Sequence, residues 1–257
     1  MNGPRDGTMI LLQQTYRSTD PRRQAELDEA RALNASCPAI AEVCTVEGSH
    51  RRWTFADLFG MAAERFPGRA CVVANSDISF DASLARAEPL LGPGVLVALT
   101  RWDDPTAPSM DGRNDAAAAR FFSHSQDAWI FRAGSLPPFR GDFQLGIPWC
   151  ENRLAYEAAA GGAVILDPAL SVRARHHHAT NVRTWRRGDA YRGPLYYPRL
   201  TTAERPVAEG LVLTDGWTPR AVPVTLTADP ADFAAALAAA ASRRRRIGLR
   251  GPVYLRG

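Results

Sequence analysis

Residues 69–75 read RACVVAN, an apolar run that follows a Pro-Gly pair and leads into the polar cluster Asn75-Ser76-Asp77. Both faces of this run carry apolar side chains, which is typical of a strand in the middle of a sheet covered by helices. The polar residues at its end are typical of a strand that delivers side chains to a ligand site. We therefore expect residues 69–75 to form a central strand with a site at its carboxyl end.

Strands and helices alternate on both sides of this run. Strands are predicted over residues 9–16, 40–45, 94–100, 128–132 and 163–166, and helices over residues 21–34, 54–66, 82–91 and 152–160. Asp20 before Pro21 and the pair Thr54 and Asp57 provide helix-start signals. This alternation predicts an α/β fold, a three-layer α/β/α sandwich with a mostly parallel central sheet and a Rossmann-like N-terminal half.

The segment after residue 200 has a weaker pattern. Residues 210–214 and 222–226 predict a hairpin around Asp215-Gly216, and residues 232–242 predict an alanine-rich helix that ends in the arginine run from Arg243 to Arg246. We therefore divide the chain into a domain over residues 1–200 and an extension over residues 201–257 that packs on the same domain.

Composition excludes several protein classes. The chain has 257 residues, 46% of them hydrophobic, and its 31 basic residues are all arginine. It has no apolar run of the roughly 20 residues needed to span a bilayer, no signal-peptide pattern, and four cysteines without a CxxC pair. These features predict a cytoplasmic protein without a disulfide framework.

The net charge of +4 is unevenly distributed. Residues 1–170 hold 16 Arg and 21 Asp or Glu, whereas residues 171–257 hold 15 Arg and 6 Asp or Glu. Such a division favours a local anion site or a basic tail over a general nucleic-acid surface. The run from Arg243 to Arg246 also lacks interleaved aromatic residues, so nucleic acid is not the expected partner, and peripheral contact with acidic lipid headgroups is an alternative.

Asp77 is a candidate metal ligand because a carboxylate at the end of a central strand can bind a divalent cation that holds a diphosphate. Mg²⁺ and Mn²⁺ prefer a few carboxylates together with phosphate oxygens and water. The alternative is an Asx-turn in which Asp77 caps the following segment.

Residues 175–178 read Arg-His-His-His. In an extended chain His176 and His178 point to one face and His177 to the other, so the first and third imidazoles could complete a metal site with Asp77. A solvated basic patch is the alternative.

Two further acidic residues lie next to predicted elements. Glu151 follows a Gly/Pro turn and enters the first turn of a helix, where the dipole favours its ionised form and suits a general base. Asp127 precedes an apolar strand. Helix capping by Glu151 and a simple turn at Asp127 are the alternatives.

Together, five segments resemble a group of bacterial and viral glycosyltransferase-like proteins of the GT-A fold. The segments are NSDISFD (75–81), ALTRWD (98–103), SQDAWIF (125–131), LGIPWCENRLAYE (145–157) and HHH (176–178). The resemblance covers about residues 8–190 and includes the helix start at residues 52–55. It implies a GT-A-like domain and a nucleotide-diphosphate sugar as donor.

The resemblance also implies a role for each site residue. Asn75-Ser76-Asp77 stands at the position of the DxD motif, so Asp77 would hold Mn²⁺ or Mg²⁺ together with a late histidine, His176 or His178. Glu151 would face the acceptor hydroxyl and Asp127 the donor sugar. The residues placed near the nucleotide are Gln14, Thr15, Arg17, Arg52, Asn75, Ser76 and Asp77. The chain departs from the pattern by Asn75 in place of Asp, by Glu151 in place of Asp, and by the additional His177.

These observations predict a metal-dependent glycosyltransferase that acts on a hydroxyl of an unidentified acceptor, for which the resemblance suggests a polysaccharide or another glycan. The nearest alternative is a nucleotidyltransferase of similar fold. A non-catalytic arginine-rich protein that binds nucleic acid is an alternative of a different class.

Overall fold

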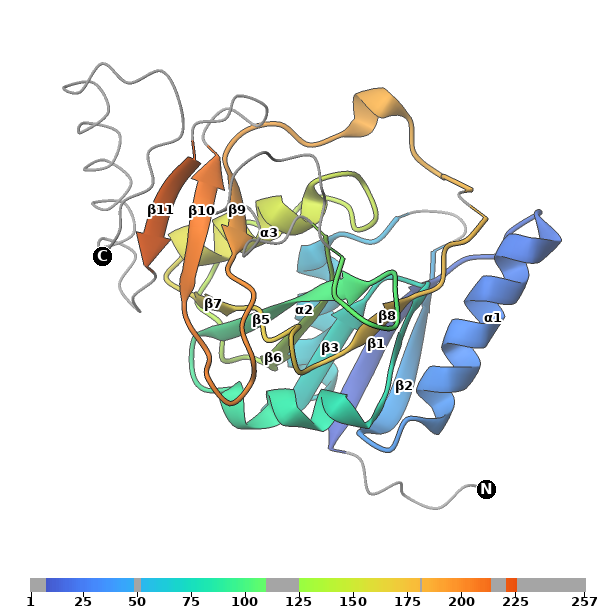
Figure 1. Cartoon of the computed structure of the whole chain (residues 1–257), viewed down its shortest axis with the longest axis horizontal. Helices are drawn as coiled ribbons and strands as arrows, with labels where there is room; N and C mark the ends of the chain where they lie inside the picture. The colour runs from blue at the N-terminus through green and yellow to red at the C-terminus, as the bar shows by residue number, and fades with distance from the viewer. Residues whose placement is uncertain (1–7, 49–51, 110–124, 181, 214–220, 226–257) are drawn as a thin grey trace.

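The computed structural model of the chain describes residues 8–48, 52–109, 125–180, 182–213 and 221–225 (Figure 1). Within these ranges, eight strands form one sheet in the order β2-β1-β3-β6-β5-β8-β4, and β7 pairs with the first part of β5. The strands are β1 (Met9–Thr15), β2 (Ile40–Glu47), β3 (Ala70–Ala74), β4 (Ile78–Phe80), β5 (Val95–Trp102), β6 (Gln126–Arg132), β7 (Val164–Leu166) and β8 (Ala174–His176). The helices within the same ranges are α1 (Pro21–Ser36), α2 (Phe55–Arg65), α3 (Cys150–Ala160) and the 3₁₀ helices η1 (Ala82–Leu90) and η3 (Arg187–Asp189).

The predicted α/β class is confirmed, and the sheet is mixed with a majority of parallel pairs. β1 pairs in parallel with β2 and β3, and β5 pairs in parallel with β7 and β8. β6 lies antiparallel between β3 and β5, and β4 lies antiparallel to β8. Because β6 runs in the opposite direction, its first residues lie at the edge where β3 and β5 end.

Helices cover both faces of the sheet because the strands are apolar on both sides. Ile10 and Leu12 of β1 belong to the hydrophobic cluster that contains buried residues of α2 and α3. Met9 and Leu11 belong to a second cluster that contains buried residues of η1. α1 packs against β2 and β4. Helices therefore lie on both faces of the sheet, as the predicted α/β class requires.

The helix starts follow the predicted capping signals. The Asp20 side chain accepts hydrogen bonds from the first backbone N–H groups of α1, and Pro21 occupies the first turn. Thr54 and Asp57 form a reciprocal capping box at the start of α2. The helix predicted over residues 82–91 is a 3₁₀ helix that contains Pro89, which cannot donate a backbone hydrogen bond.

A second sheet has three antiparallel strands in the order β11-β10-β9, namely β11 (Ala221–Thr225), β10 (Glu209–Leu213) and β9 (Leu195–Pro198). β10 and β11 occupy the positions of the predicted hairpin, whereas β9 was not predicted. The predicted helix over residues 232–242 and the arginine run that follows it lie outside the described residues. In the described part of the chain, no helix is long and apolar enough to cross a membrane.

Candidate metal centre

A tight turn between β3 and β4 carries Asp77 to the edge of the sheet. The Ile78 N–H donates to the Asn75 carbonyl at 3.2 Å. Two buried side-chain amides bind the backbone of this turn. Gln13 Nε2 donates to the carbonyls of Asn75 and Ile78 at 2.9 Å each, and Asn34 Nδ2 donates to the Ile78 carbonyl at 2.8 Å. The turn is therefore fixed by side chains from β1 and α1, and Asp77 has little freedom to move.

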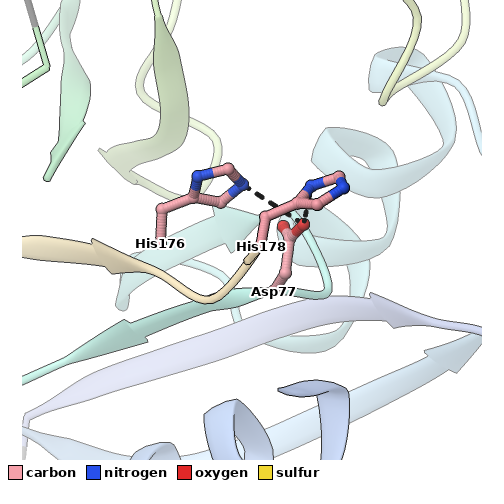
Figure 2. A group of neighbouring side chains, drawn as sticks. All are labelled: Asp77, His176 and His178. Carbon is pink, nitrogen blue, oxygen red and sulfur yellow. Dashed lines mark ion pairs between the residues drawn. The ribbon is translucent and has the colours of Figure 1, made fainter. Parts of the chain in front are cut away.

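Asp77, His176 and His178 converge at one point (Figure 2). Asp77 Oδ2 lies 3.4 Å from His176 Nε2 and 3.4 Å from His178 Nδ1, and the three potential ligand atoms lie within 4.8 Å of one another. His177 points away, and its Nε2 lies 2.8 Å from the Ser79 hydroxyl. The expected alternation along the histidine run is therefore present, and the group has the ligand types and spacing to hold a metal ion.

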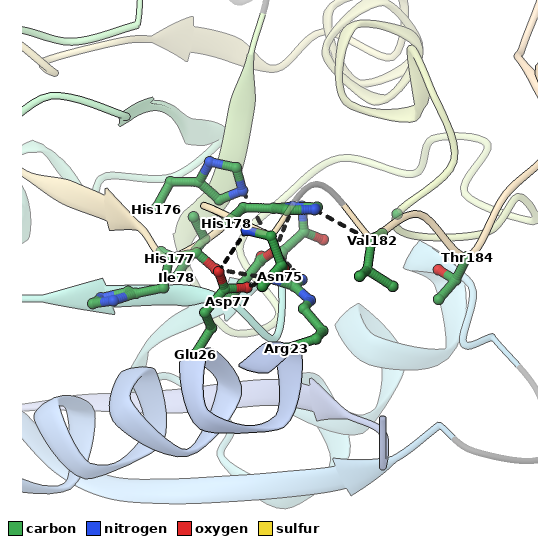
Figure 3. Close-up of polar contacts among 12 residues, drawn as sticks. Arg23, Glu26, Asn75, Asp77, Ile78, His176, His177, His178, Val182 and Thr184 are labelled. Carbon is green, nitrogen blue, oxygen red and sulfur yellow. Dashed lines mark hydrogen bonds and ion pairs between the residues drawn. The ribbon is translucent and has the colours of Figure 1, made fainter. Parts of the chain in front are cut away.

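Arg23 approaches the same carboxylate from α1 (Figure 3). Its side chain is only 3% exposed, and Nη2 lies 2.5 Å from Asp77 Oδ2. Nη1 donates to the His177 carbonyl at 2.7 Å and to Glu26 at 2.9 Å. Burial disfavours the charged form of Asp77, but the hydrogen bonds from His176 and His178 and the charge of Arg23 together hold the pKa of this carboxyl well below its usual range.

His176 lies between two carboxylates. Its Nδ1 is 2.5 Å from Asp103 Oδ1, while its Nε2 faces Asp77. Burial alone would lower the pKa of His176, but the two carboxylates outweigh it and raise that pKa to about 9. In this state His176 is an imidazolium at neutral pH, so a metal ion must displace its proton.

Asp127 lies at the start of β6 and contacts Asn75, which directly follows β3, and Arg101 of β5. Its Oδ1 accepts a short hydrogen bond from Asn75 Nδ2, and its Oδ2 lies 2.9 Å from Arg101 Nη1. Arg101 Nε is also 3.1 Å from Asp103. The antiparallel direction of β6 is what brings Asp127 to the edge that holds Asp77.

Glu151 occupies the first turn of α3, after Trp149 in a left-handed backbone conformation with φ of 64°. The expectation that the helix dipole keeps Glu151 ionised is wrong. Burial and the nearby negative charge of Asp127 raise the pKa of Glu151 to about 8. Glu151 is consequently mostly protonated at neutral pH and is poised to exchange a proton near pH 8.

The residues expected near a nucleotide lie in two places. Thr15 and Arg17 line a hollow of about 490 Å³ beside α1, at the carboxyl ends of β1 and β2. Gln14 has a structural contact, because its Oε1 accepts from the Trp53 N–H at 2.9 Å. Arg52 connects two loops, since it donates to the carbonyls of Gly146 at 3.1 Å and Thr184 at 2.7 Å.

Ser76 lies in the turn itself, beside Asp77. The arginines that flank the histidines in sequence do not pair with Asp77: Arg173 packs over the Trp102 ring and Arg183 over the Trp185 ring. The guanidinium groups at the site carboxylates instead come from Arg101, which lies in the ALTRWD segment, and from Arg23, which was not predicted as a site residue.

Comparisons with known proteins do not assign this chain to a family. The chain matches no model of a known protein family, and no curated protein matches it. The relation to GT-A glycosyltransferases expected from the sequence motifs therefore stays a prediction.

Proposed function

We propose that this protein is a metal-dependent glycosyltransferase that transfers a sugar from a nucleotide-diphosphate sugar to an acceptor hydroxyl. The observation that carries the proposal is the convergence of Asp77, His176 and His178 where strands of a mostly parallel sheet end. Ligands of open α/β sheets bind at this edge. The sequence motifs that resemble GT-A enzymes supply the same three residues.

The donor atoms suit a transition-metal ion. One carboxylate and two imidazoles form a mixed oxygen and nitrogen set, which favours Mn²⁺ or a similar ion over Mg²⁺, because Mg²⁺ prefers oxygen ligands alone. A metal ion held by Asp77, His176 and His178 would neutralise the negative charge of a departing diphosphate. Arg23 and Arg101 place two further positive charges among the site carboxylates.

The hollow beside α1 is the proposed place of the donor nucleoside. Its wall includes Tyr16, whose hydroxyl accepts a hydrogen bond from Arg23 Nε at 3.0 Å, and Arg23 in turn binds Asp77. The hollow is therefore connected to the candidate metal centre by two polar contacts. A nucleoside there would direct its diphosphate toward Asp77.

Glu151 is the proposed residue facing the acceptor. A carboxyl with a pKa of about 8 loses its proton close to physiological pH, as a general base for a hydroxyl must. If the transfer inverts the sugar's configuration, Glu151 takes the hydroxyl proton; if it retains the configuration, Glu151 orients the acceptor. Asp127, within electrostatic reach of Glu151, is the proposed contact of the donor sugar.

A thermal-shift panel tests the proposal. UDP-, GDP- and CDP-sugars and the nucleoside triphosphates are added with and without Mn²⁺, and the best ligand is then titrated calorimetrically. We expect a nucleotide-sugar to stabilise the protein only with Mn²⁺, and Asp77→Asn to abolish this binding. Asp142→Asn, at an exposed carboxylate paired with Arg140, is the matched control and should bind as the wild type does.

Two results would overturn the proposal. Stabilisation by a nucleoside triphosphate but by no nucleotide-sugar would point to a nucleotidyltransferase instead. Equal binding by the wild type and Asp77→Asn would remove Asp77 from the metal site.

A further inference from the structure

The register of two strands places Asp103 beside His176. β5 and β8 run in parallel and pair Arg101 with Ala174 and Trp102 with Arg175. The next step of this ladder brings together Asp103, which follows β5, and His176, the last residue of β8. Their side chains meet at 2.5 Å between Oδ1 and Nδ1. The contact is therefore set by strand pairing.

The two ring nitrogens of His176 have different partners. Nδ1 faces Asp103, and Nε2 faces Asp77 Oδ2 at 3.4 Å. Both partners are carboxylates, which accept hydrogen bonds when ionised, but Asp103 lies much closer than Asp77, so the single proton of the neutral ring lies on Nδ1 in the hydrogen bond to Asp103. The lone pair is then left on Nε2, which points at the other two members of the candidate metal centre.

His178 has the opposite arrangement. Its Nε2 lies 3.1 Å from the Val182 carbonyl, which only accepts, and its Nδ1 lies 3.4 Å from Asp77 Oδ2. A metal ion bound at Asp77 would need the lone pair on Nδ1, and the proton of the neutral ring would then lie on Nε2 in the contact with the Val182 carbonyl, which Figure 3 draws. The two histidines thus present different nitrogens to the same point.

We infer that Asp103 is a positioning residue that holds His176 for metal binding through Nε2, while the Val182 carbonyl holds His178 for binding through Nδ1. This inference rests on the proposed metal site. Carboxylates and carbonyls that bind the second nitrogen of a ligating histidine fix both its tautomer and its ring orientation. Asp103 is part of the ALTRWD segment, whose polar end follows a predicted strand, but nothing in that segment indicates which side chain Asp103 contacts.

Asp103 is itself held in place by a closed series of contacts. Arg101 Nε lies 3.1 Å from Asp103, and Arg101 Nη1 lies 2.9 Å from Asp127. Asp127 then accepts from Asn75 Nδ2, and Asn75 is two residues before Asp77 in the same turn. The series returns to the candidate metal centre, so a shift of Asp103 would disturb His176 and the turn together.

The test measures metal binding and the histidine tautomers separately. Mn²⁺ alone is titrated calorimetrically into the wild type, Asp103→Ala, Asp103→Asn and the control Asp104→Ala, which removes a neighbouring carboxylate that bonds to Thr106. We expect Asp103→Ala to weaken Mn²⁺ binding by about tenfold to a hundredfold. Asp103→Asn, whose amide oxygen can still accept from Nδ1, should lose less, and Asp104→Ala should match the wild type.

Nitrogen-15 NMR of the protein loaded with diamagnetic Zn²⁺ gives a readout that a loss of stability alone would not change. We expect the protonated nitrogen to be Nδ1 in His176 and Nε2 in His178, and the His176 signature to change in Asp103→Ala. Equal Mn²⁺ affinity of Asp103→Ala and the wild type, or a proton on Nε2 of His176, overturns the inference alone. A wild type that binds neither Mn²⁺ nor Zn²⁺ overturns the proposed metal site together with it.

Discussion

Arg23 and Asp77 form a buried ion pair on the floor of the candidate metal centre. Their side chains are 3% and 10% exposed, and the guanidinium also contacts Tyr16, Glu26 and the His177 carbonyl. A charge in such an environment is tolerated only while its partners satisfy it. Removing one member therefore leaves the charge of the other buried without its partner. The resulting loss in free energy of unfolding is larger than the net contribution of the intact pair.

A double-mutant cycle measures this coupling. We expect Arg23→Met to lower the free energy of unfolding by about 3 kcal/mol, and Arg23→Met combined with Asp77→Asn to lower it by less than the sum of the two single changes. Urea unfolding of the four proteins in EDTA provides the measurement. Additive losses would mean that the pair is not coupled.

The exposed pair of Arg31 and Asp28, with side chains 45% and 54% exposed, is the matched control. The corresponding cycle there should give a coupling of no more than about 1 kcal/mol, because solvent screens the charges. A coupling at Arg31 and Asp28 as large as that at Arg23 and Asp77 would argue against burial as the cause.

At the scale of elements, α1 contributes to the site through its buried face. The buried residues of this helix are Arg23, Leu27, Ala30 and Asn34, which follow one another at spacings of four, three and four. Two polar residues thus share a stripe with two apolar ones. Arg23 reaches the Asp77 carboxylate, and Asn34 binds the turn and strand that follow it, so a single helix face supports the whole Asp77 turn.

Asn34 should affect both stability and metal binding. Its Nδ2 donates to the Ile78 carbonyl and its Oδ1 accepts from the Phe80 N–H at 3.0 Å, all in a buried setting. We expect Asn34→Ala to lower the free energy of unfolding by roughly 2 kcal/mol, since the buried Phe80 N–H loses the Asn34 acceptor and the Ile78 carbonyl keeps only the hydrogen bond from Gln13. Because Asn34 also supports the turn that carries Asp77, we expect the variant to bind Mn²⁺ more weakly, which calorimetry would measure.

Ser36→Ala, at the exposed end of the same helix, is the control for this prediction and should change stability by no more than about 0.5 kcal/mol. Loss of stability in Asn34→Ala with unchanged Mn²⁺ affinity would show that the turn keeps its shape without this amide.

The central strands were predictable because their apolar runs are long enough to be distinguished from loops. β1, β3 and β5 lie within two residues of their predicted bounds. β4 and β8 have three residues each and include polar side chains, so no apolar run marks them and only strand pairing defines them. β7 is equally short, but its three residues are all apolar, and it was predicted.

The site was predictable only where its residues formed sequence motifs. A shared metal site of Asp77 and the histidines could be predicted from their residue types and from the sequence motifs in which they lie. Arg23 and Asn34 could not, although one signal was present: both lie in phase with the apolar residues Leu27 and Ala30. A polar residue on the apolar stripe of a helix indicates a buried polar network, but its partners depend on tertiary packing.

At the scale of the whole molecule, groups with opposite pKa shifts determine how stability depends on pH. Burial raises the pKa of Asp167 to about 7, although Thr100 and the Ala169 N–H bond to its carboxyl, and the pKa of Glu151 is raised to about 8. These groups keep their protons in the folded state at pH values where the unfolded chain has lost them. The pKa of Asp77 is lowered, which has the reverse effect.

The signs follow from proton linkage. Groups with a raised pKa contribute stability that is complete below their unfolded values near pH 4 and is lost as pH rises toward 7 or 8. Asp77 contributes stability above its unfolded value, and this is lost as pH falls below about 4. His176, with a pKa of about 9, adds a further loss above its unfolded value of about 6.5. The metal-free protein should therefore be most stable at mildly acidic pH.

We expect the free energy of unfolding in EDTA to fall by several kcal/mol from about pH 4.5 to about pH 7.5, as urea titrations across this range would measure. The variants Asp167→Asn and Glu151→Gln each remove one carboxyl with a raised pKa and should reduce the dependence of stability on pH. Glu64→Gln, on the exposed face of α2, should leave that dependence unchanged. Because metal binding requires a neutral His176, Mn²⁺ should restore stability on the alkaline side and move the maximum upward in pH. A metal-free maximum at neutral pH, unaffected by both variants, would show that Asp167 and Glu151 are ionised in the folded protein.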